Sequence, residues 1–152
     1  MNEELTALAR SLDLAHESHA QLRYAFGLAC VERVRHLLED ARAVAALDRL
    51  GAYVAGALDF AGLEAARGEV ERVARSHPGS KSIDGAAHAA VSATNAVAHA
   101  LAGRALDAAS YAAYASVYAY GGAAVMDRSA FGDEFRWQEQ ALTRLAGLRS
   151  AA

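Results

Sequence analysis

Two long stretches of this sequence carry almost no charge, and they restrict how the chain can fold. Between Ile83 and Leu101 the only charged residue is Asp84, and between Asp107 and Asp127 there is none. Both stretches are rich in alanine, the residue with the highest helix propensity. Two uncharged helices cannot both face water over their whole surface. We therefore expect them, at roughly 83–102 and 107–125, to form the centre of a helical bundle.

The composition extends this expectation to the whole chain. Alanine makes up roughly a quarter of the 152 residues, and Pro78 is the only proline. A hydrophobic fraction of 54% with 22% charged residues is typical of a soluble globular protein. No Ser/Gly-rich linker divides the sequence, and the length suits one domain. The sequence therefore predicts an all-α fold, with residues 1–152 forming a single-domain bundle of six or seven helices and two central alanine-rich helices.

Amphipathic patterns predict the other helices. Apolar residues recur every three or four positions near 5–12, 22–38, 44–58, 63–77 and 131–145, which is the spacing of one helix face. Ser18 and Gln21 match a capping box at the start of the second of these segments.

Other residues predict where individual helices start and stop. Asp59 is expected to cap the segment near 63–77, and Pro78-Gly79 to end it. Ser82 or Asp84 is expected to cap the first uncharged helix, and Gly103 to end it. The second uncharged helix is expected to run from near Asp107 to about Ala124, and the last helix from about Ser129 to Leu148.

Charge and cysteine content exclude several classes of partner. The net charge is −3, and no cluster of lysine and arginine forms a basic stripe, so we expect no nucleic-acid partner. One cysteine, Cys30, permits no intramolecular disulfide and suits a cytoplasmic protein. The N-terminal segment contains acidic residues and no positive region, unlike a signal peptide. The stretch 83–101 also contains several polar side chains, so we expect no membrane association.

The uncharged stretches contain the polar residues that are the best candidates for a site, and these residues share helix faces. His88 and His99 are eleven residues apart, or about three helical turns, with Asn95 one turn before His99. The tyrosines of the second stretch repeat at helical spacing. The candidate ligand-binding residues are therefore His88, Asn95, His99, Tyr111, Tyr114 and Tyr118. Alternatively, the histidines are buried with neutral hydrogen-bond partners, and the tyrosines pack in the core.

No recognised catalytic or metal-binding motif accompanies these residues. The sequence lacks a Gly-rich phosphate loop, paired-cysteine zinc spacing, His-Glu-x-x-His and Gly-x-Ser-x-Gly. His16 and His19 have a spacing that permits joint metal ligation, but no second cluster completes a site. Cys30 lies on an apolar helix face, as expected of a buried thiol. We therefore predict no catalytic residues, no metal and no cofactor.

The second amphipathic segment contains Cys30-Val31-Glu32-Arg33-Val34. This run is similar to a "Cys-Ala-Glu-Arg-Val" pattern in the immunity-five-like family of bacterial immunity proteins, which the sequence resembles in several parts. Three later segments, 86–89, 98–101 and 109–112, resemble its "Gly-His-Ala … His-Ala … Tyr-Ala" region, and Trp137 suits its C-terminal helix. This chain has Tyr53 where the family has tryptophan, and lacks a histidine near Thr94. The resemblance implies an all-helical protein that binds and neutralises a toxin.

Three hypotheses about function follow. The first, which the absence of catalytic motifs favours, is a non-enzymatic helical protein-interaction domain of bacterial origin, with a protein toxin as its partner. The second is a helical enzyme, or a small-ligand or metal binder, that uses His88, His99 and the tyrosines of the central helices. The third is a structural homodimer in which the uncharged helices form the interface.

Overall fold

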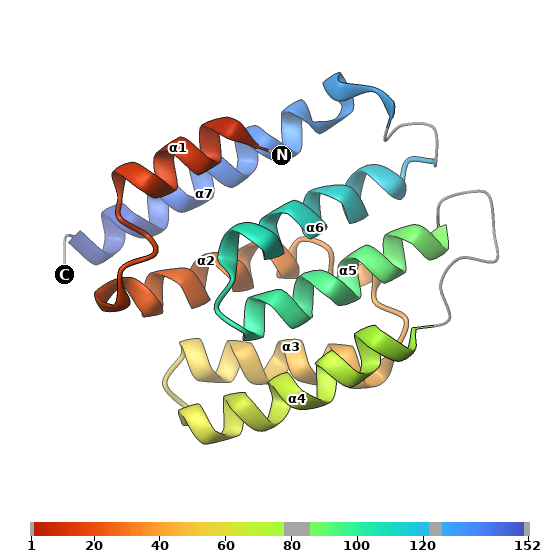
Figure 1. The fold of residues 1–152 in the computed structure, drawn as a ribbon, viewed down its shortest axis with the longest axis horizontal. Coiled ribbons are helices and arrows are strands. Elements are labelled where there is room, and N and C mark those ends of the chain that lie inside the picture. The colour runs from red at the N-terminus through yellow and green to blue at the C-terminus, as the bar shows by residue number, and fades with distance from the viewer. Residues whose placement is uncertain (1, 78–85, 122–125, 151–152) are drawn as a thin grey trace.

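The computed structural model describes residues 2–77, 86–121 and 126–150, and it confirms an all-α bundle (Figure 1). The described part contains seven α-helices and no strand. Their bounds are α1 (Glu3–Ser11), α2 (Ala20–Glu32), α3 (Ala41–Val54), α4 (Phe60–Ser76), α5 (Ala86–Leu101), α6 (Ala105–Tyr118) and α7 (Gly132–Ser150). Short 3-10 turns at Glu17–His19, Arg35–Leu37 and Arg128–Phe131 lie between them.

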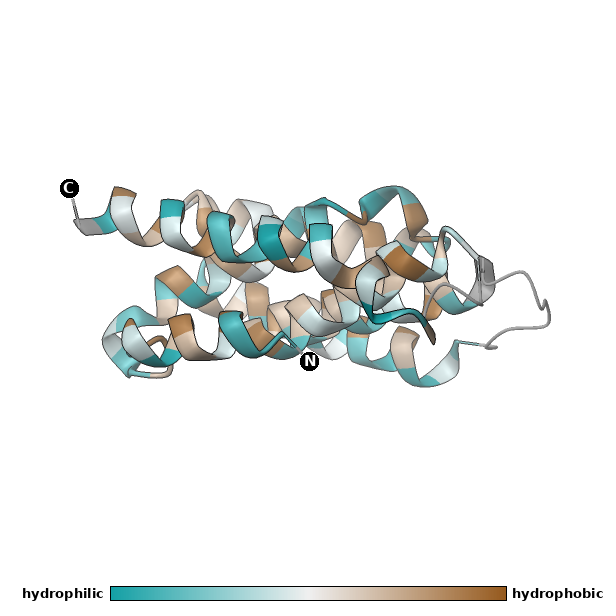
Figure 2. Cartoon of the chain, turned by 90° about the horizontal axis from the view of Figure 1, so that it is seen from above, coloured by the Kyte–Doolittle hydropathy of each residue, from teal (hydrophilic) through white to brown (hydrophobic). Residues whose placement is uncertain are grey.

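The helices form two layers. In Figure 1, α1, α6, α5 and α4 lie side by side in front, and α7, α2 and α3 lie behind them. Seen from above, the ribbons form two rows (Figure 2). The layers are joined because α2 packs on both α5 and α6, α3 packs on α4 and α5, and α7 packs on α1 and α6. The main core lies between the two rows and contains residues from all seven helices.

The closest helix pair is α5 and α6, whose contact is made largely of alanine. Buried alanines include Ala93 and Ala96 on α5 and Ala108 and Ala112 on α6. Small side chains let two helix axes approach closely. The connection between the helices requires Gly103, which has φ of +76°, and a Cβ there would lie 3.3 Å from the Tyr24 hydroxyl oxygen.

The predicted central position of the uncharged helices needs one correction. They lie in the middle of the front layer and pack on α2, but no helix among the described residues covers their outward face. That face presents tyrosine and histidine to solvent instead of charge: Tyr111 is 37% exposed and Tyr114 38%. Amphipathic aromatic side chains suit such a boundary, because the ring packs on apolar neighbours while the polar atom faces water.

The predicted capping box at Ser18 is wrong. The Ser18 hydroxyl lies 2.7 Å from His16 Nδ1, and Gln21 Nε2 donates to the Tyr53 hydroxyl at 3.4 Å. His16 is itself the cap of the 3-10 turn, since its Nδ1 accepts the Ser18 N–H. Helix α2 starts later, after His19, without a side-chain cap.

Two helices also end earlier in the structure than the sequence predicts. Helix α2 ends at Glu32 instead of continuing to Leu38, because the chain leaves the helical conformation at Val34, with φ of −116°. The apolar spacing nevertheless continues, since Val34 is buried and Leu37 and Leu38 pack against the core after the turn. Helix α6 ends at Tyr118, three residues before Gly121, which has φ of +133°.

Other predicted boundaries are confirmed or lie outside the described residues. Asp59 caps α4 by accepting the Gly62 N–H at 2.8 Å. The predicted signals at Pro78-Gly79, Ser82 and Asp84 fall in the segment 78–85, which the structure does not describe.

A polar contact joins the back-layer helices α2 and α7. Arg33 at the end of α2 donates from Nε and Nη2 to the two carboxylate oxygens of Glu134, at 2.8 and 3.0 Å. The guanidinium also lies 4.5 Å from the centre of the Trp137 ring. Cys30 is buried beneath this contact, and its pKa is raised by burial and by the nearby Glu134 carboxylate. The prediction of a buried, unreactive thiol therefore agrees with its surroundings.

Candidate functional site

The outward face of α5 and α6 carries the candidate residues predicted from the sequence. On α5 the histidines and Asn95 fall on one stripe because steps of seven and four residues return to the same side of a helix. On α6 the steps of three and four between the tyrosines do the same. Because the two helices run antiparallel, each histidine lies opposite a tyrosine of α6, and two ring stacks form.

The first stack joins His99 to Tyr111 near the α5–α6 connection. The ring centroids lie 5.0 Å apart and the planes are inclined by 12°. The Nδ1 atom of His99 is buried and has no hydrogen-bond partner among the described residues. Burial lowers the pKa of His99, and the nearby Arg104 lowers it further, while Asp107 and Glu71 oppose this shift. Burial and the Arg104 charge therefore favour a neutral imidazole.

The second stack joins His88 to Tyr118 at the other end of the helix pair. Its centroids lie 5.1 Å apart, with an inclination of 24°. Tyr114 lies between the stacks, 6.3 Å from the Tyr118 ring and 5.3 Å from the Phe131 ring. The outward face is therefore one aromatic strip instead of a pocket. We call it the aromatic strip, and its members are His88, His99, Tyr111, Tyr114 and Tyr118.

Asn95 does not take part in either stack. Its amide nitrogen donates to the Val91 carbonyl one turn earlier, at 3.0 Å. The six candidate residues thus share one face but do not meet at one point, since the two stacks lie at opposite ends of the α5–α6 pair. Of the six, Tyr114 lines a cavity of about 580 Å³ beside α1 and α7.

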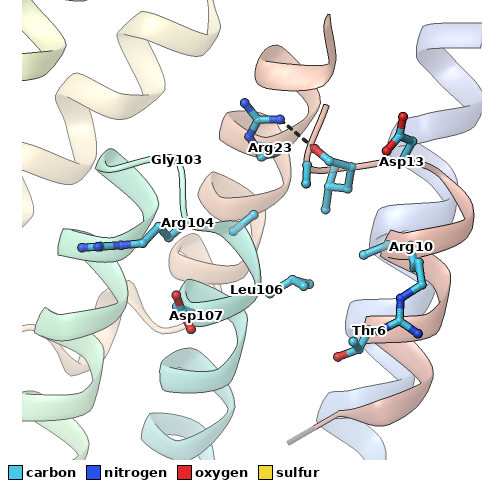
Figure 3. Close-up of a pocket in the computed structure, with 12 residues that line it drawn as sticks. Thr6, Arg10, Asp13, Arg23, Gly103, Arg104, Leu106 and Asp107 are labelled. Atoms are coloured by element: carbon cyan, nitrogen blue, oxygen red, sulfur yellow. Dashed lines mark hydrogen bonds between the residues drawn. The ribbon is translucent and has the colours of Figure 1, made fainter. Parts of the chain in front are cut away.

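A cleft runs beside the aromatic strip, between α1 and α6. Three adjoining cavities of about 400, 320 and 580 Å³ lie along it. The first two share Thr6, Leu106 and Asp107, and the second and third share Asn2 and Ser110. Figure 3 shows the first cavity, with Thr6, Arg10 and Asp13 on one side and Gly103, Leu106 and Asp107 on the other.

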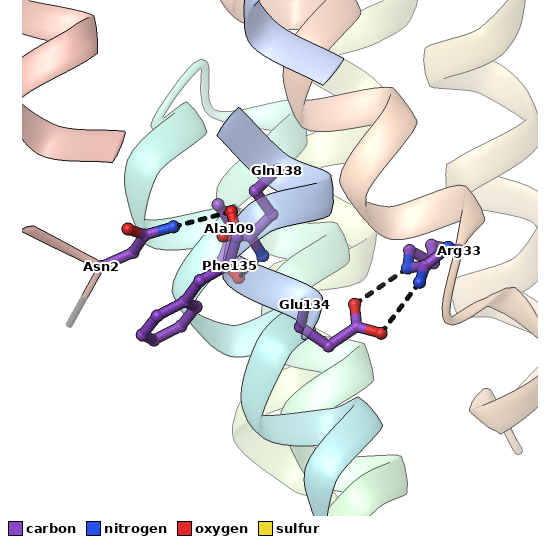
Figure 4. A network of polar contacts seen from close by, with 6 residues as sticks. All are labelled: Asn2, Arg33, Ala109, Glu134, Phe135 and Gln138. Atoms are coloured by element: carbon purple, nitrogen blue, oxygen red, sulfur yellow. Dashed lines mark hydrogen bonds and ion pairs between the residues drawn. The ribbon is translucent and has the colours of Figure 1, made fainter. Parts of the chain in front are cut away.

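The cleft exists because α1 packs on α7 and not closely on α6. Asn2 fixes the start of α1: its side-chain oxygen accepts the Leu5 N–H at 3.0 Å, and its amide nitrogen donates to the Phe135 carbonyl at 3.2 Å (Figure 4). On the α6 side, small residues such as Ser110 and Ala113 do not fill the space.

Gln138 of α7 forms part of the cleft floor. Its side chain is nearly inaccessible, at 2% exposure, and its Nε2 donates to the Ala109 carbonyl at 2.8 Å. Its Oε1 is buried and has no hydrogen-bond partner among the described residues. The sequence reasoning did not identify this residue. The available signal was its position, because Gln138 is a polar residue between Phe135 and Leu142 on the apolar face of α7.

The aromatic strip and the cleft each present groups that can bind a partner or ligand. No group of three or more histidine, cysteine or acidic residues able to hold a metal ion occurs in the part of the chain that the structure describes. His16 and His19 each use Nδ1 locally, toward Ser18 and the Asp13 carbonyl. The aromatic strip offers flat ring surfaces with phenol and imidazole edges, and the cleft offers hydrogen-bonding groups between apolar walls.

Comparison with protein-family models, with characterised proteins and with solved structures found no match to this chain. Within the described residues, every helix is too short or too polar to cross a lipid bilayer.

Proposed function

We propose that this protein is a non-enzymatic protein-binding domain whose contact surface is the aromatic strip. The observation that carries the proposal is the exposure of tyrosines on a helix face that has no charged side chain between Asp107 and Tyr118. Charged residues are depleted and tyrosine is enriched at the centres of protein interfaces. An exposed face with this composition suits a partner protein better than it suits bulk water.

The stacked arrangement also suits binding. Tyr111 and Tyr118 are each held against a histidine ring, so both enter an interface with little remaining rotamer freedom to lose. Tyrosine is one of the residues that most often contribute large binding energies. Tyr114 extends the surface toward Phe131 at the edge of the cleft.

The partner class that we propose is a bacterial protein toxin, with this chain as its cytoplasmic immunity protein. The resemblance of residues 30–34 and of the alanine-rich segments to the immunity-five-like family supports this partner. The all-helical fold agrees with what that resemblance implies. Masking a toxin requires a surface and no catalytic group, in agreement with the absence of a recognised catalytic motif in the sequence.

The experiment is co-expression with the product of an adjacent toxin-like gene, read out as growth rescue and co-purification. The double variant Tyr111→Ala, Tyr114→Ala should weaken association by about tenfold or more, as expected for removal of two central interface tyrosines. Phe60→Ala is the matched control, because Phe60 is an exposed aromatic residue on α4, outside the strip. Circular dichroism shows whether each variant is folded.

Three outcomes would contradict the proposal. The wild-type chain fails to rescue growth or to co-purify with the toxin, or the double variant binds as well as Phe60→Ala does. In the third, light scattering gives a dimer mass for the wild-type chain and a monomer mass for the double variant, because the strip would then be a homodimer interface.

A further inference from the structure

The cavity of about 580 Å³ lies where the cleft meets the aromatic strip, and we call it the end cavity. Three aromatic rings line it and contact one another in sequence. The ring centroid of Phe131 lies 5.3 Å from that of Tyr114 and 5.5 Å from that of Phe135. Tyr114 therefore belongs to both the strip and the end cavity, and a partner protein seated on the strip at Tyr114 lies beside the cavity.

Carboxylates outnumber free cations around the end cavity. Three carboxylates line it without an ion pair to any described residue, those of Glu3, Glu4 and Glu139. Of the two arginines that line it, Arg136 is paired with Asp133, and Arg128 has no acidic partner among the described residues. Glu3 and Glu4 also lie in the first turn of α1, where acidic residues stabilise a helix, but Glu139 lies in the interior of α7.

These charges act on the cavity through their summed field. At physiological ionic strength the field of a charge extends over about 8 Å. Carboxylates around a space of this volume therefore favour a cation inside it, and no single group of a ligand has to contact all of them. A polypeptide segment that enters the cavity from the side of the strip should accordingly carry a positive charge.

An arginine side chain matches this combination of rings and carboxylates. Its guanidinium is planar and always charged, stacks on aromatic faces and donates two hydrogen bonds to one carboxylate. The chain shows the same chemistry between α2 and α7, where Arg33 donates to both oxygens of Glu134 (Figure 4) and lies 4.5 Å from the centre of the Trp137 ring. A lysine would supply the charge without the flat surface.

We propose that the end cavity receives an arginine side chain from a basic segment of the partner protein whose main contact is the aromatic strip. The rings of Tyr114 and Phe131 pack against this side chain, and the three carboxylates supply the counter-charge. Arg128 is a like charge at the same cavity and opposes entry. The inference deepens the proposed function by naming the chemistry of the partner's surface, and it rests on that function for the partner's identity.

The test is an NMR titration of the full-length chain with blocked tripeptides, followed at the backbone amides of Ser110, Phe131 and Gly132. The probes are acetyl-Gly-Arg-Gly-amide, its lysine counterpart, and its citrulline counterpart, which has a similar shape without the charge. We expect saturable shifts with the arginine peptide, with a dissociation constant on the order of 1 mM. The lysine peptide should bind at least about threefold more weakly, and the citrulline peptide should not saturate.

Charge variants should shift the affinity in both directions. The double variant Glu3→Gln, Glu4→Gln should weaken binding of the arginine peptide at least about threefold, the size expected for exposed charges. Arg128→Gln should tighten it about twofold for the same reason. The control Glu17→Gln, Glu39→Gln removes the same charge from exposed residues that do not line the cavity, and it should leave the affinity unchanged. Circular dichroism shows whether each variant is folded.

The proposal is overturned if the arginine peptide gives no saturable shift, or if the lysine or citrulline peptide binds as tightly. It is also overturned if the two double variants bind the peptide alike.

Failure of the proposed function would give a different pattern. Tyr111 does not line the end cavity, so Tyr111→Ala should leave peptide binding unchanged. If Tyr111→Ala also leaves toxin binding intact while Glu3→Gln, Glu4→Gln weakens the peptide, the end cavity is supported and the strip is contradicted. If the toxin binds through the strip and Glu3→Gln, Glu4→Gln changes neither toxin nor peptide binding, only the end cavity is contradicted.

Discussion

At the scale of single residues, the polar side chains in the alanine-rich helices are the informative ones. His99 has a buried Nδ1 without a hydrogen-bond partner, stacked on Tyr111. Groups from neighbouring elements also act on this ring: Arg104 lowers its pKa, and Asp107 and Glu71 raise it. Because burial is the largest effect, the folded-state pKa lies below the unfolded value of about 6.5.

This shift predicts how stability changes with pH. Between pH of about 6.5 and the lower folded-state pKa, the unfolded chain binds more protons at His99 than the folded chain does. The free energy of unfolding should therefore fall as the pH decreases through this window, and His99 should contribute no slope above it. Urea unfolding at several pH values measures the effect. His99→Gln should flatten the slope in this window, and an unchanged slope would contradict the assigned cause.

The residue scale also shows what sequence reasoning can and cannot identify. The shared faces of the histidines and tyrosines follow from helical spacing alone. Their pairing into two stacks does not, because it depends on the antiparallel packing of α5 on α6. Gln138 stands out as a polar residue on an apolar stripe, but its unsatisfied oxygen appears only when its neighbours are placed.

At the scale of helices, close approach through small side chains is the main determinant of packing. Gly27 of α2 faces Ala100 of α5, and a Cβ at position 27 would lie 3.3 Å from the Ala100 Cβ and 3.5 Å from its Cα. Neither atom belongs to a flexible side chain. The distance between α2 and α5 therefore depends on the absence of a single methyl group.

A pair of glycine substitutions tests this contact. Gly27→Ala gains helix propensity but forces α2 away from α5, and overpacking typically costs about 1–3 kcal/mol, so we expect a net loss on the order of 1 kcal/mol. Gly51→Ala in α3 has nothing within 4 Å of the added Cβ and should stabilise by about 0.5–1 kcal/mol. Thermal or urea unfolding measures both, and equal stabilisation would contradict the packing argument.

The contact between α2 and α7 gives a second prediction at this scale. Arg33 makes two hydrogen bonds to Glu134, which has 11% of its side chain exposed. Arg33 is 37% exposed, so solvent screening limits the contribution to about 1 kcal/mol. A double-mutant cycle with Arg33→Met and Glu134→Gln should measure that coupling. The pair Arg136–Asp133 on the surface of α7 is the control and should show no measurable coupling.

Helix boundaries show where the sequence pattern is insufficient. Asp59 is correctly predicted as a cap because an acidic side chain at that position satisfies a local N–H group. The Ser18–Gln21 pair matches a capping box equally well, yet both side chains bond elsewhere. The difference arises from tertiary contacts, since Gln21 reaches Tyr53 on α3. Periodicity likewise continues from α2 through the 3-10 turn, because the core extends along both.

At the scale of the whole molecule, the helices differ in how extensively they pack on their neighbours. Helices α5 and α2 each pack on several neighbours, whereas α1 packs mainly on α7 and borders the cleft on its other side. Helix α1 buries Leu5 and Ala9, while α6 buries seven residues. A helix with fewer buried contacts opens at lower free energy than the global fold.

Native-state hydrogen exchange should reveal this difference. We expect the amides of α1 to exchange through a local opening that leaves α5 and α6 protected, and the protection of α5 and α6 should report global unfolding. As the urea concentration rises, the opening free energies of the α1 amides and of the α5 and α6 amides should converge. If, without urea, the amides of α1 exchange only through the global unfolding that also exposes those of α6, then α1 has no separate opening and the prediction is wrong.

The short connection between α5 and α6 has a kinetic consequence. Three residues, 102–104, separate the two helices that pack most closely, so bringing them together requires closure of a very small loop. The α1–α7 contact joins opposite ends of the chain, which is the most distant pairing in the fold. Contacts between nearby segments form faster than distant ones. The α5–α6 hairpin is therefore the expected folding nucleus, and the step that docks α1 and creates the cleft comes last.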